Sequence, residues 1–365
     1  MKKGVKFRIY PNKEQQNLIN QTFGCCRLIY NKGLALRSEA YQTGQKAGYK
    51  ETSAMLTVLK QESEYGFLKI VDSIALQQTL RDLDRGFVNF FQKRAKYPVF
   101  KSKHHQYQSY RTINQKDNIR IEGNRIKLPK LGYVKIKQSM EVGCIHNVTI
   151  SRTPTGKYFA VLNVEFEPAL KEKTNKVVGI DVGIKSFYTD SNEMVVENPK
   201  YLEKTMRKLK REQRRLSRKQ KGSKNRNKQR IKVAGIHEKI VNQRNDFLQK
   251  QSTMLISENQ TIIIEDLKVK NMMKNHRLAG AIGSVSWSRF FDMLEYKATW
   301  YGNEIIRVAT TYPSSQTCSC CGYQNPMVKN LAVRKWECPN CDVTHDRDKN
   351  ASRNILIKGM ETLSA

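Results

Sequence analysis

Two closely spaced cysteine pairs constrain the fold of this chain most strongly. Cys318-x2-Cys321 is followed, after 16 residues, by Cys338-x2-Cys341. Each pair can present two thiolates from one tight turn, and two such turns supply the tetrahedral four-sulfur shell that Zn²⁺ prefers. Gly322 follows the first pair, where such a turn often needs a positive φ. Because a four-cysteine shell leaves no position for water, we predict one structural zinc ion.

Two disulfides are the alternative for these four cysteines. The segment MKKGVKFRIYPNKEQQ lacks the apolar core of a signal peptide, and no apolar run approaches the roughly 18 residues that span a bilayer. We therefore expect a reducing compartment, in which clustered thiols bind metal rather than oxidise. Cys320 is expected to be a bystander, and Cys25, Cys26 and Cys144 are expected to be core residues.

The net charge points to a polyanionic partner. The 365 residues include 66 Lys and Arg against 33 Asp and Glu, which gives a formal charge of +33. A folded protein with this charge repels itself unless a polyanion neutralises it, and nucleic acid is the usual partner. The charge argues against an enzyme of small-molecule metabolism.

The positive charge is concentrated between residues 204 and 232. Of these 29 residues, 15 are Lys or Arg and only Glu212 is acidic. A solvated helix face is the simpler explanation, but the mutual repulsion favours a contact with phosphates. The candidate nucleic-acid-binding residues are Lys204, Arg207, Lys208, Arg211, Arg214, Arg215 and Arg218.

Hydrophobic periodicity divides the chain into an α/β multidomain protein. Residues 1–10 alternate as a strand, 11–96 have helical periodicity with Asn12 as a cap, and 97–170 return to strands. Since one strand cannot form a sheet, we expect the first strand to pair with the later ones around a helical insertion. Beyond residue 175, buried strands alternate with helices, and one or two long basic helices are predicted over residues 201–258, broken around residues 221–224.

Four acidic residues stand where this pattern predicts strand ends and a helix start. Asp181 ends VVGID, Glu265 ends TIIIE, and Asp346 and Asp348 lie in HDRDKNASRNI. Carboxylates that converge in this way can hold two Mg²⁺ ions for phosphodiester hydrolysis. The order of strand Asp, later strand Glu and final-helix Asp is that of an RNase H-like nuclease core. Asp266 points to the opposite face and is the weaker choice.

Each acid also has a simpler explanation when it is considered alone. Asp181 could close a turn, Glu265 could pair with a nearby lysine, and Asp348 could cap the last helix. Their order, together with the charge of the chain, favours the nuclease interpretation.

Several motifs together resemble the TnpB family, the RNA-guided endonucleases encoded by insertion sequences and similar to type V CRISPR effectors. The resemblance covers essentially the whole chain. The motifs are YPNKEQ, LQQTLRDLDRGFVNFF, GIDVGIKSF, IIIEDLKV, SWSRFFDMLEYKATWYG, YPSSQTCSCCG, ECPNC and HDRDKNASRNI.

The resemblance implies a bilobed protein with a wedge-type β-barrel, an inserted helical recognition domain and an RNase H-like RuvC nuclease domain that carries a zinc finger. The implied ranges are 1–10 and 97–170 for the wedge barrel, 11–96 for the recognition domain, 175–312 and 342–365 for the RuvC-like domain, and 313–341 for the zinc-finger insert.

The resemblance also implies an activity. Such a protein binds an RNA made from the end of its mobile element, recognises a short motif beside the target, and cuts double-stranded DNA at one Mg²⁺-dependent site. Asp181, Glu265 and Asp348 would be catalytic and hold two Mg²⁺ ions, with Asp346 as the alternative third acid. The zinc ligands would be Cys318, Cys321, Cys338 and Cys341.

The expected setting is a prokaryotic cytoplasm, where one chain would act with one guide RNA in association with the nucleoid and without a membrane. Two alternatives remain open. Some family members have lost the carboxylates and act as RNA-guided repressors, although this chain keeps all three. RNase H-like cores also serve strand transfer, so a transposase or a transposase accessory protein is the second alternative.

Overall fold

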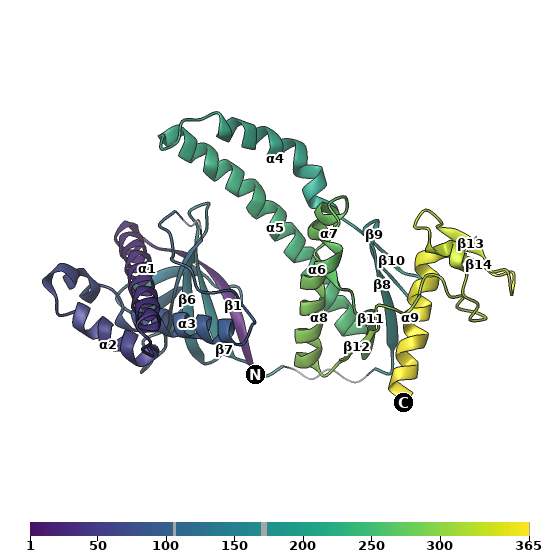
Figure 1. Ribbon diagram of the computed structural model, residues 1–365, viewed down its shortest axis with the longest axis horizontal. Helices are drawn as coiled ribbons and strands as arrows, with labels where there is room; N and C mark the ends of the chain where they lie inside the picture. The colour runs from purple at the N-terminus through teal and green to yellow at the C-terminus, as the bar shows by residue number, and fades with distance from the viewer. Residues whose placement is uncertain (105–106, 169–173, 365) are drawn as a thin grey trace. The chain divides into compact units, whose positions relative to one another are not determined.

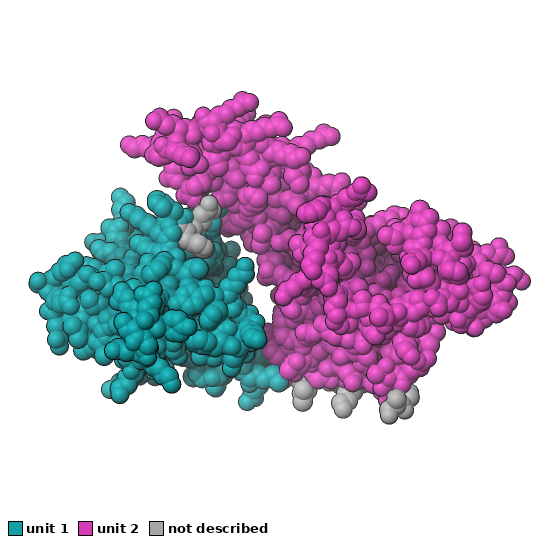
Figure 2. Space-filling view, viewed as in Figure 1, with its two compact units in different colours: residues 1–167 teal, residues 168–365 magenta. Residues whose placement is uncertain are grey.

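The computed structural model describes residues 1–104, 107–168 and 174–364, and it comprises two compact units, Met1–Glu167 and Pro168–Ala365 (Figures 1 and 2). The predicted ranges 97–170 and 342–365 both end on residues outside the described part of the chain. Each unit has its own hydrophobic core.

The described part of unit 1 contains a curled antiparallel sheet of seven strands in the order β2-β6-β7-β1-β5-β4-β3 (Figure 1). Strand β1 pairs with both β5 and β7, which confirms that the first strand belongs with the later ones. The strands are β1 (Lys2–Tyr10), β2 (Gln108–Ile113), β3 (Arg120–Glu122), β4 (Arg125–Leu128), β5 (Gly132–Lys137), β6 (Ile145–Arg152) and β7 (Tyr158–Glu165).

The helical insertion of unit 1 packs on this sheet. It consists of α1 (Lys13–Gln42), α2 (Tyr49–Leu59), the 3₁₀ helix η1 (Ser63–Lys69) and α3 (Ser73–Phe91). Asn12 caps α1 as predicted: its Oδ1 accepts from the Gln15 amide at 2.8 Å, and the Gln15 side chain accepts from the Asn12 amide at 3.0 Å. Phe7 of β1 and Phe23 of α1 share one core.

The prediction for the isolated cysteines holds in two cases out of three. Cys25 and Cys26 are buried in the core of unit 1, on α1. The prediction for Cys144 was wrong, because its side chain is exposed. Cys144 precedes β6 in an irregular segment, where the alternation of a strand does not turn the side chain inward.

The described residues of unit 2 form a five-stranded sheet in the order β10-β9-β8-β11-β12. Strands β8, β11 and β12 run parallel to one another, whereas β9 and β10 are antiparallel to their neighbours. The strands are β8 (Val177–Val182), β9 (Ser186–Asp190), β10 (Val195–Glu197), β11 (Thr261–Glu265) and β12 (Glu304–Val308).

Helices cover both faces of this sheet (Figure 1). The helices in the described part of unit 2 are α4 (Tyr201–Ser217), α5 (Lys224–Glu258), α6 (Val269–Met272), α7 (Ala279–Val285), α8 (Trp287–Tyr301) and α9 (Arg347–Ser364), and α4 packs along α5. Ile262 and Ile264 of β11 pack in one core with α5 and α8, whereas Ile263 packs on the opposite face with Ile355 of α9. The predicted break between two basic helices lies between Ser217 and Lys224.

A buried lysine joins α8 to α5. Lys297 is 5% exposed, and its Nζ donates to the Gln249 carbonyl at 2.9 Å and to the hydroxyls of Ser252 and Thr253 at 2.7 Å each. Burial disfavours the charged form and lowers the pKa of Lys297 to about 8.

Between β12 and α9 lies a small subdomain with the four clustered cysteines. It contains the 3₁₀ helix η2 (Pro326–Lys329) and a two-stranded antiparallel sheet of β13 (Lys335–Glu337) and β14 (Thr344–Asp346). Strand β14 leads directly into α9, so the cysteine subdomain is joined to the helix that packs on the sheet. In the described residues, each helix is too short or too polar to cross a membrane.

Candidate metal centres and basic surface

The three candidate catalytic acids all lie in unit 2, two of them at the carboxyl ends of adjacent parallel strands and the third at the start of α9. The register pairs Ile180 of β8 with Ile264 of β11, so Asp181 and Glu265 come next on the two strands. Glu265 shares the face of Ile263, which packs against α9. Asp348 lies in the first turn of α9, on the helix that covers this face.

The electrostatics of Asp181 show that the three acids interact. Burial raises the pKa of Asp181 well above its ordinary value, and the negative charges of Glu265 and Asp348 raise it further. Arg347 and Arg334 act in the opposite direction. Since a charge acts strongly only at short range, Glu265 and Asp348 both lie near Asp181, and repulsion of this kind is what a divalent cation relieves.

Glu265 is held by a hydroxyl from another loop. Ser314 Oγ donates to Glu265 Oε1 at 2.6 Å. Burial raises the pKa of Glu265, and the hydrogen bond from Ser314 lowers it because the bond favours the charged form. The bond engages one of the two carboxylate oxygens.

Asp346 and Asp348 have different surroundings. Asp346 Oδ1 accepts from the amides of Asp348 at 3.1 Å and Lys349 at 3.2 Å, so Asp346 caps the start of α9. The capping role considered for Asp348 therefore belongs to Asp346. The Asp348 carboxylate instead lies 3.3 Å from Arg334 and acts electrostatically on Asp181. Asp266, the weaker choice, pairs with Lys268 and Arg307.

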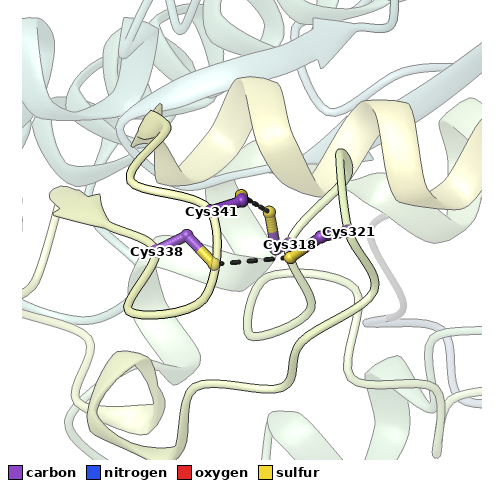
Figure 3. A group of neighbouring side chains, drawn as sticks. All are labelled: Cys318, Cys321, Cys338 and Cys341. Atoms are coloured by element: carbon purple, nitrogen blue, oxygen red, sulfur yellow. Dashed lines mark hydrogen bonds between the residues drawn. The ribbon is translucent and has the colours of Figure 1, made fainter.

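The four predicted zinc ligands converge in one cluster, in which the side chains point toward one another (Figure 3). The Sγ atoms of Cys318 and Cys341 are 3.6 Å apart, as are those of Cys321 and Cys338. These separations are too long for disulfides, and a tetrahedral shell with Zn–S bonds of about 2.3 Å would place neighbouring sulfurs about 3.8 Å apart. The donor set and its spacing fit Zn²⁺.

The two cysteine turns have matching backbones. In the first, the Gly322 amide donates to the Cys318 carbonyl at 2.9 Å, and in the second the Asp342 amide donates to the Cys338 carbonyl at 2.9 Å. Gly322 has φ 78°, as predicted, and Asp342 at the equivalent position has φ 55°. Both turns therefore use a left-handed residue directly after the second cysteine.

Sequence reasoning missed a histidine beside this cluster. His345 Nε2 lies 3.0 Å from Cys318 Sγ, and its ring packs against Trp336 with centroids 4.8 Å apart. Cys318, Cys320 and His345 form a second group with metal-ligand spacing, although Cys320 is exposed. His345 follows Cys341 by only four residues, and this short spacing was the feature of the sequence that could have placed it beside the cluster.

The seven candidate nucleic-acid-binding residues are all exposed on α4 or at its end. Five of them, joined by Lys210, line one basic groove: Arg207, Arg211, Arg214, Arg215 and Arg218. Glu212, the acid within this run, is buried. Its Oε2 accepts from Gln229 of α5 at 2.8 Å, and its Oε1 pairs with Arg215 at 3.0 Å and Arg211 at 3.3 Å. Glu212 thus fixes α4 on α5 and leaves the outer surface strongly positive.

Comparison with known proteins finds relatives along the whole chain. A protein of Streptomyces pristinaespiralis named "Putative RNA-guided DNA endonuclease" is 41% identical over 99% of this chain and 90% of its own length. The Escherichia coli (strain K12) protein "Putative RNA-guided DNA endonuclease InsQ" is 34% identical over 98% of this chain and 92% of its own length. "TnpB-like protein L770" of Acanthamoeba polyphaga mimivirus is 24% identical over 98% of this chain and 73% of its own length.

Two solved structures share the fold at low sequence identity. The chain in "Cryo-EM structure of the Cas12f1-sgRNA-target DNA complex" matches with a TM-score of 0.56 and 14% identity, over 97% of this chain and 98% of that chain. The chain in "Structure of the mini-RNA-guided endonuclease CRISPR-Cas_phi3" matches with a TM-score of 0.50 and 9% identity, over 98% and 92% of the two chains.

Three family descriptions match separate parts of the sequence. Residues 1–46 match "Helix-turn-helix domain", although here they form β1 and the single helix α1. Residues 161–276 match "Probable transposase", and residues 287–355 match "Cas12f1-like, TNB domain". Since the relatives at 41% and 34% identity match over nearly the full length, the chain belongs to the TnpB family.

Proposed function

We propose that this protein is an RNA-guided DNA endonuclease that uses an RNA from its mobile element to find and cut double-stranded DNA. The observation that carries the proposal is that the charges of Glu265 and Asp348 both act on the buried Asp181, in a chain of charge +33. The full-length identity to relatives named as such endonucleases supports it. One chain would act with one RNA on the nucleoid DNA of a prokaryotic cytoplasm.

We assign unit 2 as the RuvC-like nuclease, with an RNase H-like order of catalytic acids. The parallel strands β8 and β11 carry the first two acids, and α9 carries the third. The capping role of Asp346 supports Asp348 as that third acid, because the Asp346 carboxylate already accepts two backbone amides. Unit 1 would supply the wedge and recognition modules, and the cysteine subdomain would contact target nucleic acid.

The carboxylate cluster fits two Mg²⁺ ions, since it offers hard oxygen ligands whose charges repel one another. When bound there, Mg²⁺ would supply an activated water and stabilise the leaving oxygen of a phosphodiester. The chain's own residues orient this chemistry: Ser314 holds one oxygen of Glu265, and Arg334 holds Asp348. The four cysteines would hold one Zn²⁺ that stabilises the fold around the start of α9.

The basic groove of α4 would contact RNA phosphates. Arg side chains bind phosphate oxygens through paired N–H donors. Glu212 pairs with Arg211 and Arg215, and the groove also carries Arg207, Lys210, Arg214 and Arg218, so it keeps a net positive charge. The proposal therefore separates the molecule's tasks: phosphate contact on α4, and hydrolysis at the sheet face under α9.

A guide-replacement experiment tests the proposed function. The protein is purified with its RNA, the 3′ segment of the RNA is replaced, and plasmids with the old or the new matching site are incubated with Mg²⁺. Double-strand breaks should follow the new guide, and Asp181→Ala should bind the new site without cutting it. Binding without cutting by the unsubstituted protein would identify a repressor. Breaks at the element's own ends, whatever the guide, would identify a transposase.

A further inference from the structure

Two buried asparagines of α9 hold one short loop. Asn350 is 1% exposed and Asn354 is 2% exposed. Since they are four residues apart, they lie on the same face of the helix. Asn350 Nδ2 donates to the Thr317 carbonyl at 2.7 Å, and Asn350 Oδ1 accepts from the Ser319 amide at 3.0 Å. Asn354 Nδ2 donates to the carbonyls of Ser314 at 2.8 Å and Thr317 at 2.5 Å.

The loop held in this way connects the two candidate metal centres. At one end, Ser314 donates its hydroxyl to Glu265. At the other end, Cys318, one of the four clustered cysteines, lies between Thr317 and Ser319. Backbone carbonyls accept from several amides of this loop, among them those of Gln316 and Cys318. The side chains of α9 satisfy a different set of its polar groups, namely the carbonyls of Ser314 and Thr317 and the amide of Ser319.

The same helix carries the third acid. Asp348, Asn350 and Asn354 belong to one rigid element, so the helix that supplies Asp348 also fixes the backbone that presents the Ser314 hydroxyl. Ser314 is itself buried, which leaves its hydroxyl few alternatives to Glu265. The position of the Glu265 carboxylate relative to Asp348 therefore depends on the contact between Asn354 and Ser314.

We propose that Ser314 is a positioning residue for Glu265, and that Asn354 acts through Ser314 by holding its backbone. This inference rests on the proposed function, in which Glu265 is a metal ligand. With one oxygen of Glu265 fixed by Ser314, the carboxylate is oriented before metal binds. Removing such an outer hydrogen bond typically weakens metal affinity about 10- to 100-fold.

The first test measures Mn²⁺ binding to the full chain with its RNA by isothermal titration calorimetry. Mn²⁺ also binds to the RNA, so the titration is repeated with Asp181→Ala. Only the Mn²⁺ binding that this variant loses is assigned to the carboxylates. Ser314→Ala should weaken this binding about 10-fold or more, and Ser314→Thr, which keeps the hydroxyl, should restore most of it. Ser315→Ala is the matched control, since the Ser315 hydroxyl contacts Arg347 and not Glu265.

Cleavage provides a second measurement of the same effect. In Ser314→Ala, the Mg²⁺ concentration for half-maximal cleavage should rise about 10-fold, while the rate at saturating Mg²⁺ should recover toward that of the unsubstituted protein. A loss of rate that Mg²⁺ does not restore would contradict a positioning role.

The second test asks whether Asn354 acts through Ser314. Asn354→Ala should weaken Mn²⁺ binding to a similar degree, and the double variant should be no weaker than the weaker single variant. Asn350→Ala, which removes hydrogen bonds nearer Cys318, should hasten zinc loss to a chelator and change Mn²⁺ affinity less. Additive losses, or an equal effect of Asn350→Ala on Mn²⁺, would contradict the role of Asn354.

The controls separate this inference from the proposed function. If Asp181→Ala leaves all Mn²⁺ binding unchanged, the carboxylate cluster is not the metal site and the proposed function fails. If Asp181→Ala removes binding and Ser314→Ala matches the unsubstituted protein, only the positioning role fails. If Asn354→Ala does not fold, as judged by circular dichroism, Ser314→Ala and Ser314→Thr still decide the role of Ser314.

Discussion

A Cβ atom on Gly179 of β8 would lie only 2.5 Å from the carbonyl oxygen of Ser352 in α9. The backbone of α9 therefore passes the strand at a distance that only glycine permits. Asp181 lies two residues after Gly179 on the same face of β8, so this close approach sets how near Asp181 lies to α9 and Asp348.

Gly179→Ala should displace α9 from the sheet. We expect a loss of about 1–3 kcal/mol in the free energy of unfolding, because an added methyl has no space, together with reduced cleavage. Urea denaturation followed by tryptophan fluorescence reports on unit 2, which contains all three tryptophans. The matched control is Gly235→Ala on α5, where a Cβ would meet nothing within 4 Å. Equal stability of the two variants would contradict the close-approach argument.

Amide substitutions distinguish the two aspartates at the start of α9. Asp348→Asn should abolish cleavage, since an amide is a poor Mg²⁺ ligand, while guided target binding should persist. Asp346→Asn should still cut, because asparagine caps a helix about as well as aspartate. A gel-based cleavage assay with both variants measures the difference. Cleavage by Asp348→Asn but not by Asp346→Asn would reverse the assignment.

Metal analysis tests the cysteine cluster. Freshly purified, reduced protein should contain one Zn²⁺ per chain, and Cys338→Ser should lower the zinc content and weaken cleavage indirectly, because the cluster adjoins α9. Cys320→Ser is the control and should keep the zinc, since Cys320 is exposed and outside the four-cysteine set. Zinc-free unsubstituted protein would contradict the assignment.

The buried Lys297 predicts a specific pH dependence of stability. Its pKa is about 8 in the folded protein, against about 10.4 for an ordinary lysine. Between these values the unfolded chain holds the proton and the folded chain does not, so the free energy of unfolding should rise with pH across this window, by at most about 1.4 kcal/mol per pH unit. Lys297→Met should lack this contribution. Urea denaturation at pH 8, 9 and 10 should show the unsubstituted protein gaining stability relative to the variant; parallel curves would contradict the prediction.

The salt dependence of RNA binding tests the basic groove. Removing two charges with Arg214→Gln and Arg218→Gln should lower the slope of log affinity against log salt by about 0.7–0.9 for each phosphate that the variant no longer neutralises. Filter binding at several salt concentrations measures the slope. Lys250→Gln is the control, because Lys250 already pairs with Asp246 at 2.8 Å. An unchanged slope in the double variant would show that α4 does not bind the RNA.

Much of the fold could be predicted because its elements have regular periods. The run TIIIE alternates between two cores, and the buried strands beyond residue 175 alternate with helices as predicted. Because a single strand cannot form a sheet, the sequence predicted that β1 pairs with later strands, and it pairs with β5 and β7. Cys144 was misjudged because an irregular segment has no period that relates sequence to burial.

The candidate site could be predicted only where the spacing of residues along the sequence already determines how their side chains lie in space. The four cysteines have such a spacing, and their convergence agrees with it. The roles of Asp181, Glu265 and Asp348 remain predictions, although their charges interact. The bonds from Asn354 to Ser314 and from Ser314 to Glu265 join residues 40 and 49 positions apart. No local pattern encodes such bonds, since they exist only after α9 has docked.

The order of elements in unit 2 determines when its acidic cluster can assemble. During synthesis Asp181 and Glu265 leave the ribosome before Asp348, and α9 follows all five strands of the sheet. Until α9 has been made, Ile263 lacks the cover of Ile355, and Glu265 lacks a loop held in place by Asn354. A nascent chain that lacks α9 therefore cannot bring the three acids together. We expect nuclease activity to begin only after α9 has been synthesised and has packed on the sheet.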